Sequence, residues 1–87
     1  MTDGPFPLVL QALTAINCVD PDTTLRGEQR LADDLGVDSL GMVRLVGFLG
    51  RSMGITVRAR DMGAENFGTV ASLERYLTSK TAEGGAP

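Results

Sequence analysis

The sequence contains no histidine and only one cysteine among its 87 residues. Without histidine a Ser–His–Asp catalytic triad cannot form, and one cysteine cannot build a structural zinc site. An internal disulfide is also excluded, which suits a reducing cytoplasm, so we interpret Cys18 as a small apolar core residue. We therefore predict that the protein is not an enzyme, with no catalytic residue and no metal ligand.

Long apolar runs and an excess of basic residues are absent as well. No apolar segment approaches the roughly 18 residues of a membrane span, and no basic segment followed by an apolar run indicates a signal peptide. The net charge of −3 argues against a nucleic-acid partner. Hydrophobic residues still make up 43% of the chain, so we expect one small folded domain with neither a membrane nor a nucleic-acid partner.

The charges that are present change sign at Ser39. Residues 20–38 hold six acids and two arginines, a net charge of −4. Residues 39–60 hold four arginines and no acid, a net charge of +4. The segment that begins at Ser39 therefore differs in charge from the loop before it.

Apolar spacing predicts the helices. Val9, Leu13 and Ile16 lie on one helical face and predict a helix over about residues 6–18. Residues 20–37 are mostly polar and predict a long first loop, in which "RLADDLG" forms a turn closed by a glycine. We expect three leucines to pin this loop to the core: Leu25, Leu31 and Leu35.

The second predicted helix runs from Ser39 to about Met53, with Asp38 as its N-cap and Gly54 as its end. A short helical turn at 61–67 and a last helix at 70–77, capped by Thr69, complete an all-α fold. The small polar residues of 79–87 predict a disordered tail. The core face of the second helix is Met42, Leu45, Val46, Leu49 and Met53, and its outer face is Leu40, Arg44, Gly47 and Arg51.

Ser39 allows two interpretations at this point. It can be an ordinary polar residue of a first helical turn, or a second cap. Alternatively, it presents a hydroxyl at the positive end of the helix dipole, where an attached phosphate is favoured.

The stretch "LADDLGVDSLGMVRLV", with "ENFGTVASLERYL" after it, resembles acyl carrier proteins and peptidyl carrier domains. The resemblance covers about residues 8–78 and implies a small four-helix bundle with a long first loop and a short third helix. It implies one carrier domain over 1–87, with a folded core at about 6–78. By the same resemblance, a phosphopantetheinyl transferase attaches 4′-phosphopantetheine from coenzyme A to Ser39 in a reaction with Mg²⁺. The arm then carries an acyl or aminoacyl thioester.

The resemblance also implies roles for neighbouring residues. Asp38 would help to receive the transferase, and Leu40 would be the exposed apolar contact for partner enzymes. Val43, Arg44 and Gly47 would extend that contact surface along the helix. The implied border of a cargo pocket is Met42, Val46 and Leu49.

The second helix departs from the family in its charge. Many carriers, above all those of fatty-acid synthesis, have acids where this chain has arginines and glycines. We therefore expect a free-standing carrier of a specialised, polyketide or nonribosomal peptide-like pathway, loaded by a ligase or acyltransferase and serving downstream biosynthetic enzymes. The alternative is an adaptor with the same fold that is never modified.

Overall fold

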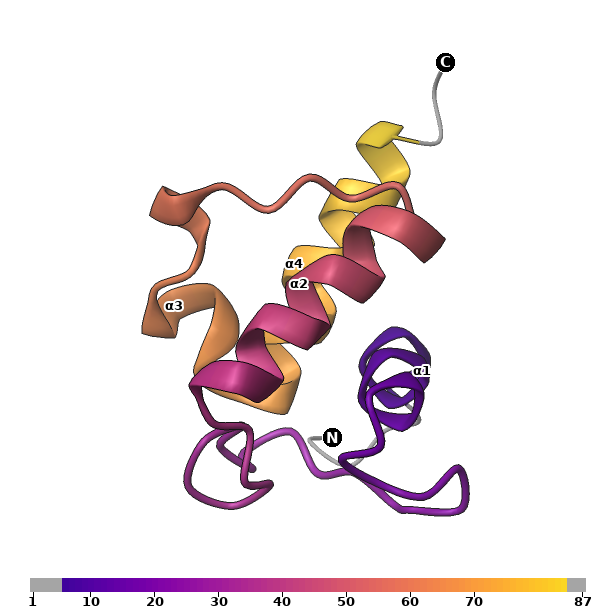
Figure 1. Cartoon of the computed structure of the whole chain (residues 1–87), viewed down its shortest axis with the longest axis vertical. Coiled ribbons are helices and arrows are strands. Elements are labelled where there is room, and N and C mark those ends of the chain that lie inside the picture. Colours follow the sequence, from indigo (N-terminus) through magenta and orange to yellow (C-terminus); the bar gives the residue numbers. More distant parts are fainter. Residues whose placement is uncertain (1–5, 85–87) are drawn as a thin grey trace.

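The computed structural model describes residues 6–84, with side chains described as far as residue 81. Within this range the chain forms helices and no strands, which confirms the all-α class. The elements are α1 (Pro7–Ala15), α2 (Ser39–Ser52), η1 (Ala59–Asp61), α3 (Ala64–Phe67) and α4 (Val70–Gly84). In Figure 1, α2 crosses in front of α4, while α1 and α3 lie on opposite sides. Helix α4 contacts both α1 and α3, and α1 contacts α2.

Helix α1 is shorter than the apolar spacing predicts. It ends at Ala15 rather than near residue 18, because Asn17 adopts a left-handed conformation with φ of 64°. The Asn17 N–H donates to the Thr14 carbonyl at 3.0 Å, and the Cys18 N–H donates to the Leu13 carbonyl at 2.9 Å. This is the Schellman pattern, in which asparagine can replace the usual glycine.

Helix α2 follows its prediction closely. It begins at Ser39 and ends at Ser52, one residue before the predicted end, and Gly54 then adopts a φ of 68° that favours glycine. Leu45 and Leu49 are fully buried on its inner face. The outer face therefore remains free for other contacts.

The long first loop is fixed to the start of α4 by backbone hydrogen bonds. The Leu31 N–H donates to the Gly68 carbonyl at 3.1 Å, and the Val70 N–H donates to the Gln29 carbonyl at 2.9 Å. Leu31 is fully buried, and the Val37 N–H donates back to its carbonyl at 2.8 Å. The loop therefore holds the residues just before α2 in a defined place.

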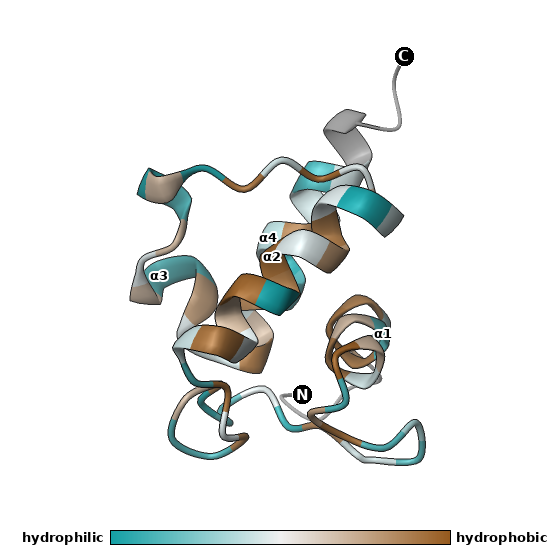
Figure 2. Ribbon diagram, viewed as in Figure 1, coloured by the Kyte–Doolittle hydropathy of each residue, from teal (hydrophilic) through white to brown (hydrophobic). Residues whose placement is uncertain are grey.

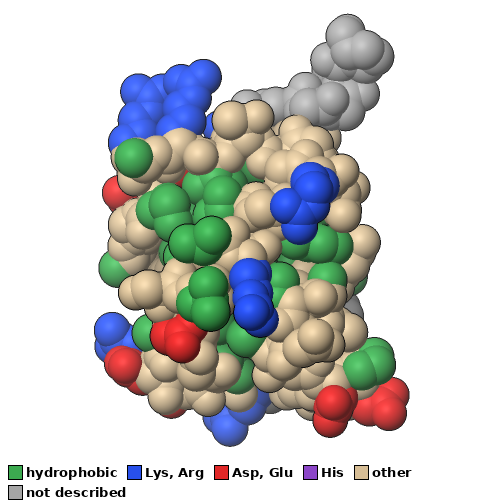
Figure 3. All heavy atoms as spheres, viewed as in Figure 1, with side chains coloured by type: hydrophobic (Ala, Val, Ile, Leu, Met, Phe, Trp, Pro, Cys, Tyr) green, Lys and Arg blue, Asp and Glu red, His purple; other side chains and the backbone are tan. Residues whose placement is uncertain are grey.

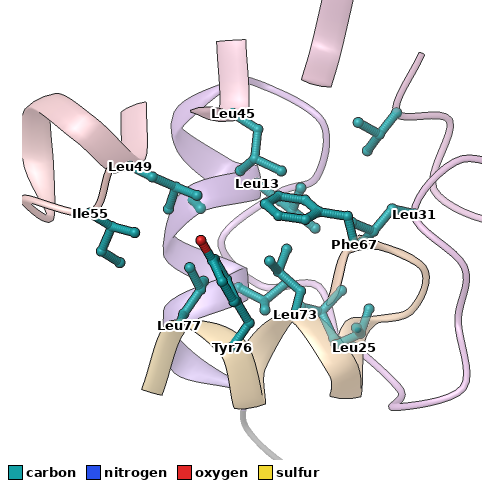
Figure 4. Packing of buried hydrophobic residues seen from close by; sticks show 14 residues of the cluster. Leu13, Leu25, Leu31, Leu45, Leu49, Ile55, Phe67, Leu73, Tyr76 and Leu77 are labelled. Atoms are coloured by element: carbon teal, nitrogen blue, oxygen red, sulfur yellow. The ribbon is translucent and has the colours of Figure 1, made fainter. Parts of the chain in front are cut away.

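The core lies where the four helices and the first loop meet (Figure 4). Leu13 of α1 and Leu73 of α4 are fully buried there, with Leu25 from the loop nearly so, and each contributes about 2 kcal/mol. Phe67 of α3 packs against Tyr76 of α4 with ring centroids 5.6 Å apart. Hydrophobic and hydrophilic residues alternate along the helices in Figure 2. No helix in the described part of the chain has the length and apolar character that crossing a bilayer requires.

Helix α4 begins as predicted but extends further. Thr69 and Ser72 cap its first turn reciprocally: each backbone N–H donates to the other residue's hydroxyl, at 3.1 and 3.2 Å. The helix then continues to Gly84, so residues 79–84 are helical rather than disordered. Lys80 contributes to this extension, since its ammonium lies 5.7 Å from the Tyr76 ring centroid one turn earlier. Residues 85–87 of the predicted tail lie outside the described residues.

A carboxylate from α4 caps the start of α1. Phe6 at the N-cap offers no side-chain acceptor, and Pro7 has no N–H to satisfy. The N–H groups of Leu8 and Val9 instead donate to the Glu74 carboxylate at 3.4 and 2.9 Å. Glu74 therefore links α4 to the N-terminus of α1, where the helix dipole places partial positive charge.

Asp61 makes a second connection to α4. Its carboxylate accepts hydrogen bonds from the Tyr76 hydroxyl at 3.0 Å and from the Arg58 N–H at 3.4 Å. Burial alone would raise the pKa of the Asp61 carboxyl, but these two hydrogen bonds, with the charges of Lys80 and Arg60, lower that pKa overall. The ionised carboxylate thus holds the loop after α2 against α4.

Replacing Glu74 by alanine is expected to lower the free energy of unfolding by about 1–2 kcal/mol, because two N–H groups of α1 lose their acceptor. Glu74→Gln keeps one acceptor oxygen and is expected to cost less. Urea denaturation followed by circular dichroism measures both values. Glu65→Ala, at an exposed glutamate, is the control; equal losses for Glu65→Ala and Glu74→Ala would contradict the capping role.

The lowered pKa of Asp61 predicts an acid-sensitive contribution to stability. The contribution is fully present above the pKa of an unfolded aspartate, about 4, and is lost as the pH falls through the lower folded value. We expect Asp61→Asn to flatten the dependence of the melting temperature on pH below about pH 4. Asp22→Asn, at an exposed loop aspartate, is expected to leave that dependence nearly unchanged. An unaltered pH dependence in Asp61→Asn would refute this assignment.

Candidate functional site

The N-terminus of α2 is capped by Asp38, as the sequence predicts. Asp38 has extended backbone angles, and its carboxylate accepts a hydrogen bond from the Gly41 N–H at 2.8 Å. A Cβ at position 41 would lie 3.3 Å from that carboxylate oxygen and 3.3 Å from Val37 Cγ1. The absence of a side chain at Gly41 therefore gives the cap room to form.

Ser39 is the first residue of α2 and is exposed to solvent. Since Asp38 provides the side-chain cap, the Ser39 hydroxyl is not needed for that role. The N–H groups of Gly41 and Met42 already donate to the Asp38 carboxylate and carbonyl. Within the described residues, those of Ser39 and Leu40 have no acceptor, which is normal for a first helical turn.

This helix end fits a covalently attached phosphodiester. Two N–H groups without acceptors lie beside the Ser39 hydroxyl, at the positive end of a 14-residue helix. A phosphate oxygen can accept from such groups without displacing the existing cap. The site can therefore present a modified serine to solvent while the helix behind it remains intact.

The surface next to Ser39 is apolar and then basic. Leu40 is 60% exposed and Val43 is 67% exposed, and they are two of the three large hydrophobic side chains that are exposed among the described residues. Arg44 is exposed one turn beyond Leu40, and Gly47 is half-buried. Four of the predicted partner-binding residues thus lie on the outer side of α2: Leu40, Val43, Arg44 and Gly47. Figure 3 shows basic side chains among hydrophobic ones on the face of the molecule that α2 crosses.

Three of these residues also line a pocket of about 380 Å³ between α2 and the end of α1. Sequence reasoning did not include the α1 wall of this pocket, because the packing of α1 against α2 is a tertiary feature. It also left Arg51 out of the partner-binding set, although Arg51 follows Gly47 by one helical turn. The lining residues are Ala15, Ile16, Asn17, Val43, Arg44, Gly47, Phe48 and Arg51.

The three residues that the resemblance predicts to border a cargo pocket lie at i, i+4 and i+7 on one side of α2. Leu49 is fully buried in the core. Met42 lines a cavity of about 240 Å³ against α3, and Val46 is half-buried, so the cargo pocket stays a prediction. A larger apolar groove, of about 490 Å³, lies elsewhere, between the outer side of α1 and Phe48 of α2.

Metal ligation and thiol chemistry find no support among the other described residues. The described residues contain no cluster of three or more side chains that suits a metal ion. The Cys18 thiol has a raised pKa, because burial and the negative charge of Asp38 outweigh the opposing effect of Arg44. The thiol therefore stays protonated and is a poor nucleophile.

Comparison with known proteins agrees with this geometry. A family model for the phosphopantetheine attachment site matches residues 8–77. The fold is similar to a chain of the Bradyrhizobium japonicum glycine:[carrier protein] ligase complexed with glycylated carrier protein, with a TM-score of 0.63 and 21% identity. That match covers 80% of this chain and 93% of the other, which is the carrier. No curated protein matches this chain in sequence. Because the family match spans most of the chain, the protein belongs to the phosphopantetheine-attachment family, whose members hold a covalent 4′-phosphopantetheine and act as carriers rather than catalysts.

Proposed function

We propose that Ser39 is the residue that carries the phosphopantetheine arm. The observation that supports this most directly is the position of its exposed hydroxyl, at the start of α2 beside two N–H groups without acceptors. The Asp38 cap leaves this hydroxyl unused. The protein then serves as a tether, and the chemistry takes place in the active sites of its partners.

The loading step balances without a catalytic group in this chain. The Ser39 oxygen attacks the phosphorus next to pantetheine in coenzyme A and forms a phosphodiester. The pyrophosphate bond breaks, and adenosine 3′,5′-bisphosphate leaves with the electron pair of that bond. The hydroxyl proton goes to a base of the phosphopantetheinyl transferase, which explains why a carrier without histidine can be modified.

We also propose that the cargo is an acyl or aminoacyl thioester in a specialised, polyketide or nonribosomal peptide-like pathway. The similarity in fold to a carrier that is glycylated by its ligase supports an aminoacyl cargo. A loading ligase or acyltransferase would form the thioester, and downstream biosynthetic enzymes would consume it. We place this shuttle, as a free-standing single domain, in the cytoplasm, where Cys18 remains reduced.

The outer face of α2 supports a selective choice of partners. Asp38, Leu40 and Val43 lie nearest to Ser39 and would be covered by a docked enzyme, with Arg44 and Gly47 further along. Arginine in place of the acids of fatty-acid carriers would repel a basic docking surface and slow its association. Acidic or neutral partner surfaces suit this carrier better.

Incubation with coenzyme A, Mg²⁺ and a broad-specificity transferase is expected to add the mass of one phosphopantetheinyl group, detected by intact mass spectrometry. Ser39→Ala is expected to gain nothing, whereas Ser52→Ala, at an exposed serine at the other end of α2, retains full modification. If several transferases leave the wild type unmodified, the protein is an adaptor with the carrier fold. Unchanged pathway output in a Ser39→Ala strain would also favour the adaptor.

A ketosynthase of fatty-acid synthesis is expected to transfer acyl groups to this carrier at least about tenfold more slowly than to an acidic carrier, because like charges oppose encounter. The variant Arg44→Glu/Arg51→Glu is expected to recover much of that rate. Arg58→Glu/Arg60→Glu makes the same change in net charge outside α2 and is expected to recover little. Equal transfer rates for wild-type and acidic carriers would refute the charge-based selectivity.

A further inference from the structure

Arg44, Gly47 and Arg51 form one stripe along the outer face of α2. They are spaced i, i+3 and i+7, so they lie on nearly the same side of the helix. All three line the 380 Å³ pocket, whose opposite wall is the C-terminal end of α1. We call the stripe and this pocket together the arginine groove.

The charges of the arginine groove have no partner within the described part of the chain. Neither Arg44 nor Arg51 forms a salt bridge there, whereas Arg30 pairs with Asp33 in the first loop at 3.3 Å. Residues 39–60 also contain no acid. In Figure 3 basic side chains stand among hydrophobic ones on this face, a composition enriched at protein interfaces.

Gly47 leaves a space on α2 that the Arg51 side chain covers. A Cβ at this position would lie 3.0 Å from Arg51 Nη1, so the guanidinium folds back over the glycine and occupies the place of a side chain. The guanidinium belongs to a flexible side chain and can move aside. A second backbone can therefore approach α2 closely at Gly47, between two positive charges.

We propose that the arginine groove binds an α-helix of a partner enzyme that carries two carboxylates two turns apart. Seven residues of helix rise about 10.5 Å, so glutamates at i and i+7 of the partner helix match Arg44 and Arg51. Small residues of the partner helix pack against Gly47, and its apolar residues cover Val43. This inference rests on the proposed function, because it assumes that the partner handles cargo on the same carrier.

A partner helix suits the arginine groove better than a carboxylate on the tethered cargo. One carboxylate paired with an exposed arginine gains little, since solvent screens the pair. A helix laid along α2 covers Leu40 and Val43, which are 60% and 67% exposed, and excludes water from both arginines at once. Desolvated, geometrically matched charge pairs contribute more to affinity and specificity.

Two helical peptides of identical composition test the proposal. One carries its two glutamates at i and i+7, and the other carries them at i and i+5, on different faces. NMR titration of the full ¹⁵N-labelled chain is expected to show at least about tenfold tighter binding of the i, i+7 peptide. The largest shifts are expected at Asn17, Val43 and Gly47. Equal affinities for the two peptides, or shifts centred on Arg58 and Arg60, would overturn it.

Matched variants separate the arginine groove from general charge attraction. Arg44→Gln/Arg51→Gln is expected to abolish the preference for the i, i+7 peptide, and Arg58→Gln/Arg60→Gln is expected to retain it. Gly47→Ala is expected to weaken binding several-fold, whereas Gly50→Ala makes the same change of residue outside the arginine groove and is expected to bind as the wild type does. Equal weakening by both glycine variants would contradict the close approach at Gly47.

Repeating these titrations on unmodified and on phosphopantetheinylated protein tests the carrier function and the arginine groove separately. The arginine groove lies beyond Ser39, so both forms are expected to prefer the i, i+7 peptide. Failure of modification with this preference intact would refute the carrier function alone. Successful modification without the preference would refute the arginine groove alone. If loading the arm with a succinyl group shifts the NMR signal of Gly47 and neither peptide does, the proposal is overturned. A carboxylate on the cargo is then the better occupant of the arginine groove.

Discussion

The backbone hydrogen bonds between the first loop and the start of α4 are the constraint on which the functional site depends. Leu31 and Val70 exchange bonds across this junction with Gly68 and Gln29. At the junction, Gly68 has no room for a side chain, because its backbone packs against the Ala64 carbonyl. A long polar loop would otherwise move freely. Fixed in this way, it delivers Asp38 and Ser39 to one edge of the bundle.

Helix α2 needs that support because its own sequence favours a helix only weakly. Gly41, Gly47 and Gly50 each cost about 1 kcal/mol relative to alanine in a helix interior. Buried Leu45 and Leu49 offset this cost through packing. Two of these glycines leave space for other groups: Gly41 for the Asp38 cap, and Gly47 for the Arg51 guanidinium. Stability comes from the inner face, and the outer face is free to serve recognition.

Sequence reasoning recovered what depends on local pattern. Apolar spacing located the helices, and the Asp38 cap and Gly54 end of α2 agree with the structure. The end of α1 was missed because an asparagine, rather than a glycine, takes the left-handed position. The Glu74 cap and the α1 wall of the arginine groove were also missed, because contacts between distant segments leave no local signal. The border of a cargo pocket was inferred from resemblance and stays a prediction: Met42 lines a cavity against α3, whereas Leu49 is buried in the core.

The charges of the chain change sign at Ser39, and this change bears on the choice of partners. The acids of the first loop lie before Ser39 in the chain and the arginines lie after it, so an enzyme that docks at the proposed attachment site would meet opposite charges before and after it. Such a dipolar surface orients an approaching partner as well as attracting it, since only one orientation satisfies both fields. The fold and the cofactor are properties of the whole family. The proposed choice of partners therefore rests on the outer side chains of α2, above all on Arg44 and Arg51 with Gly47 between them.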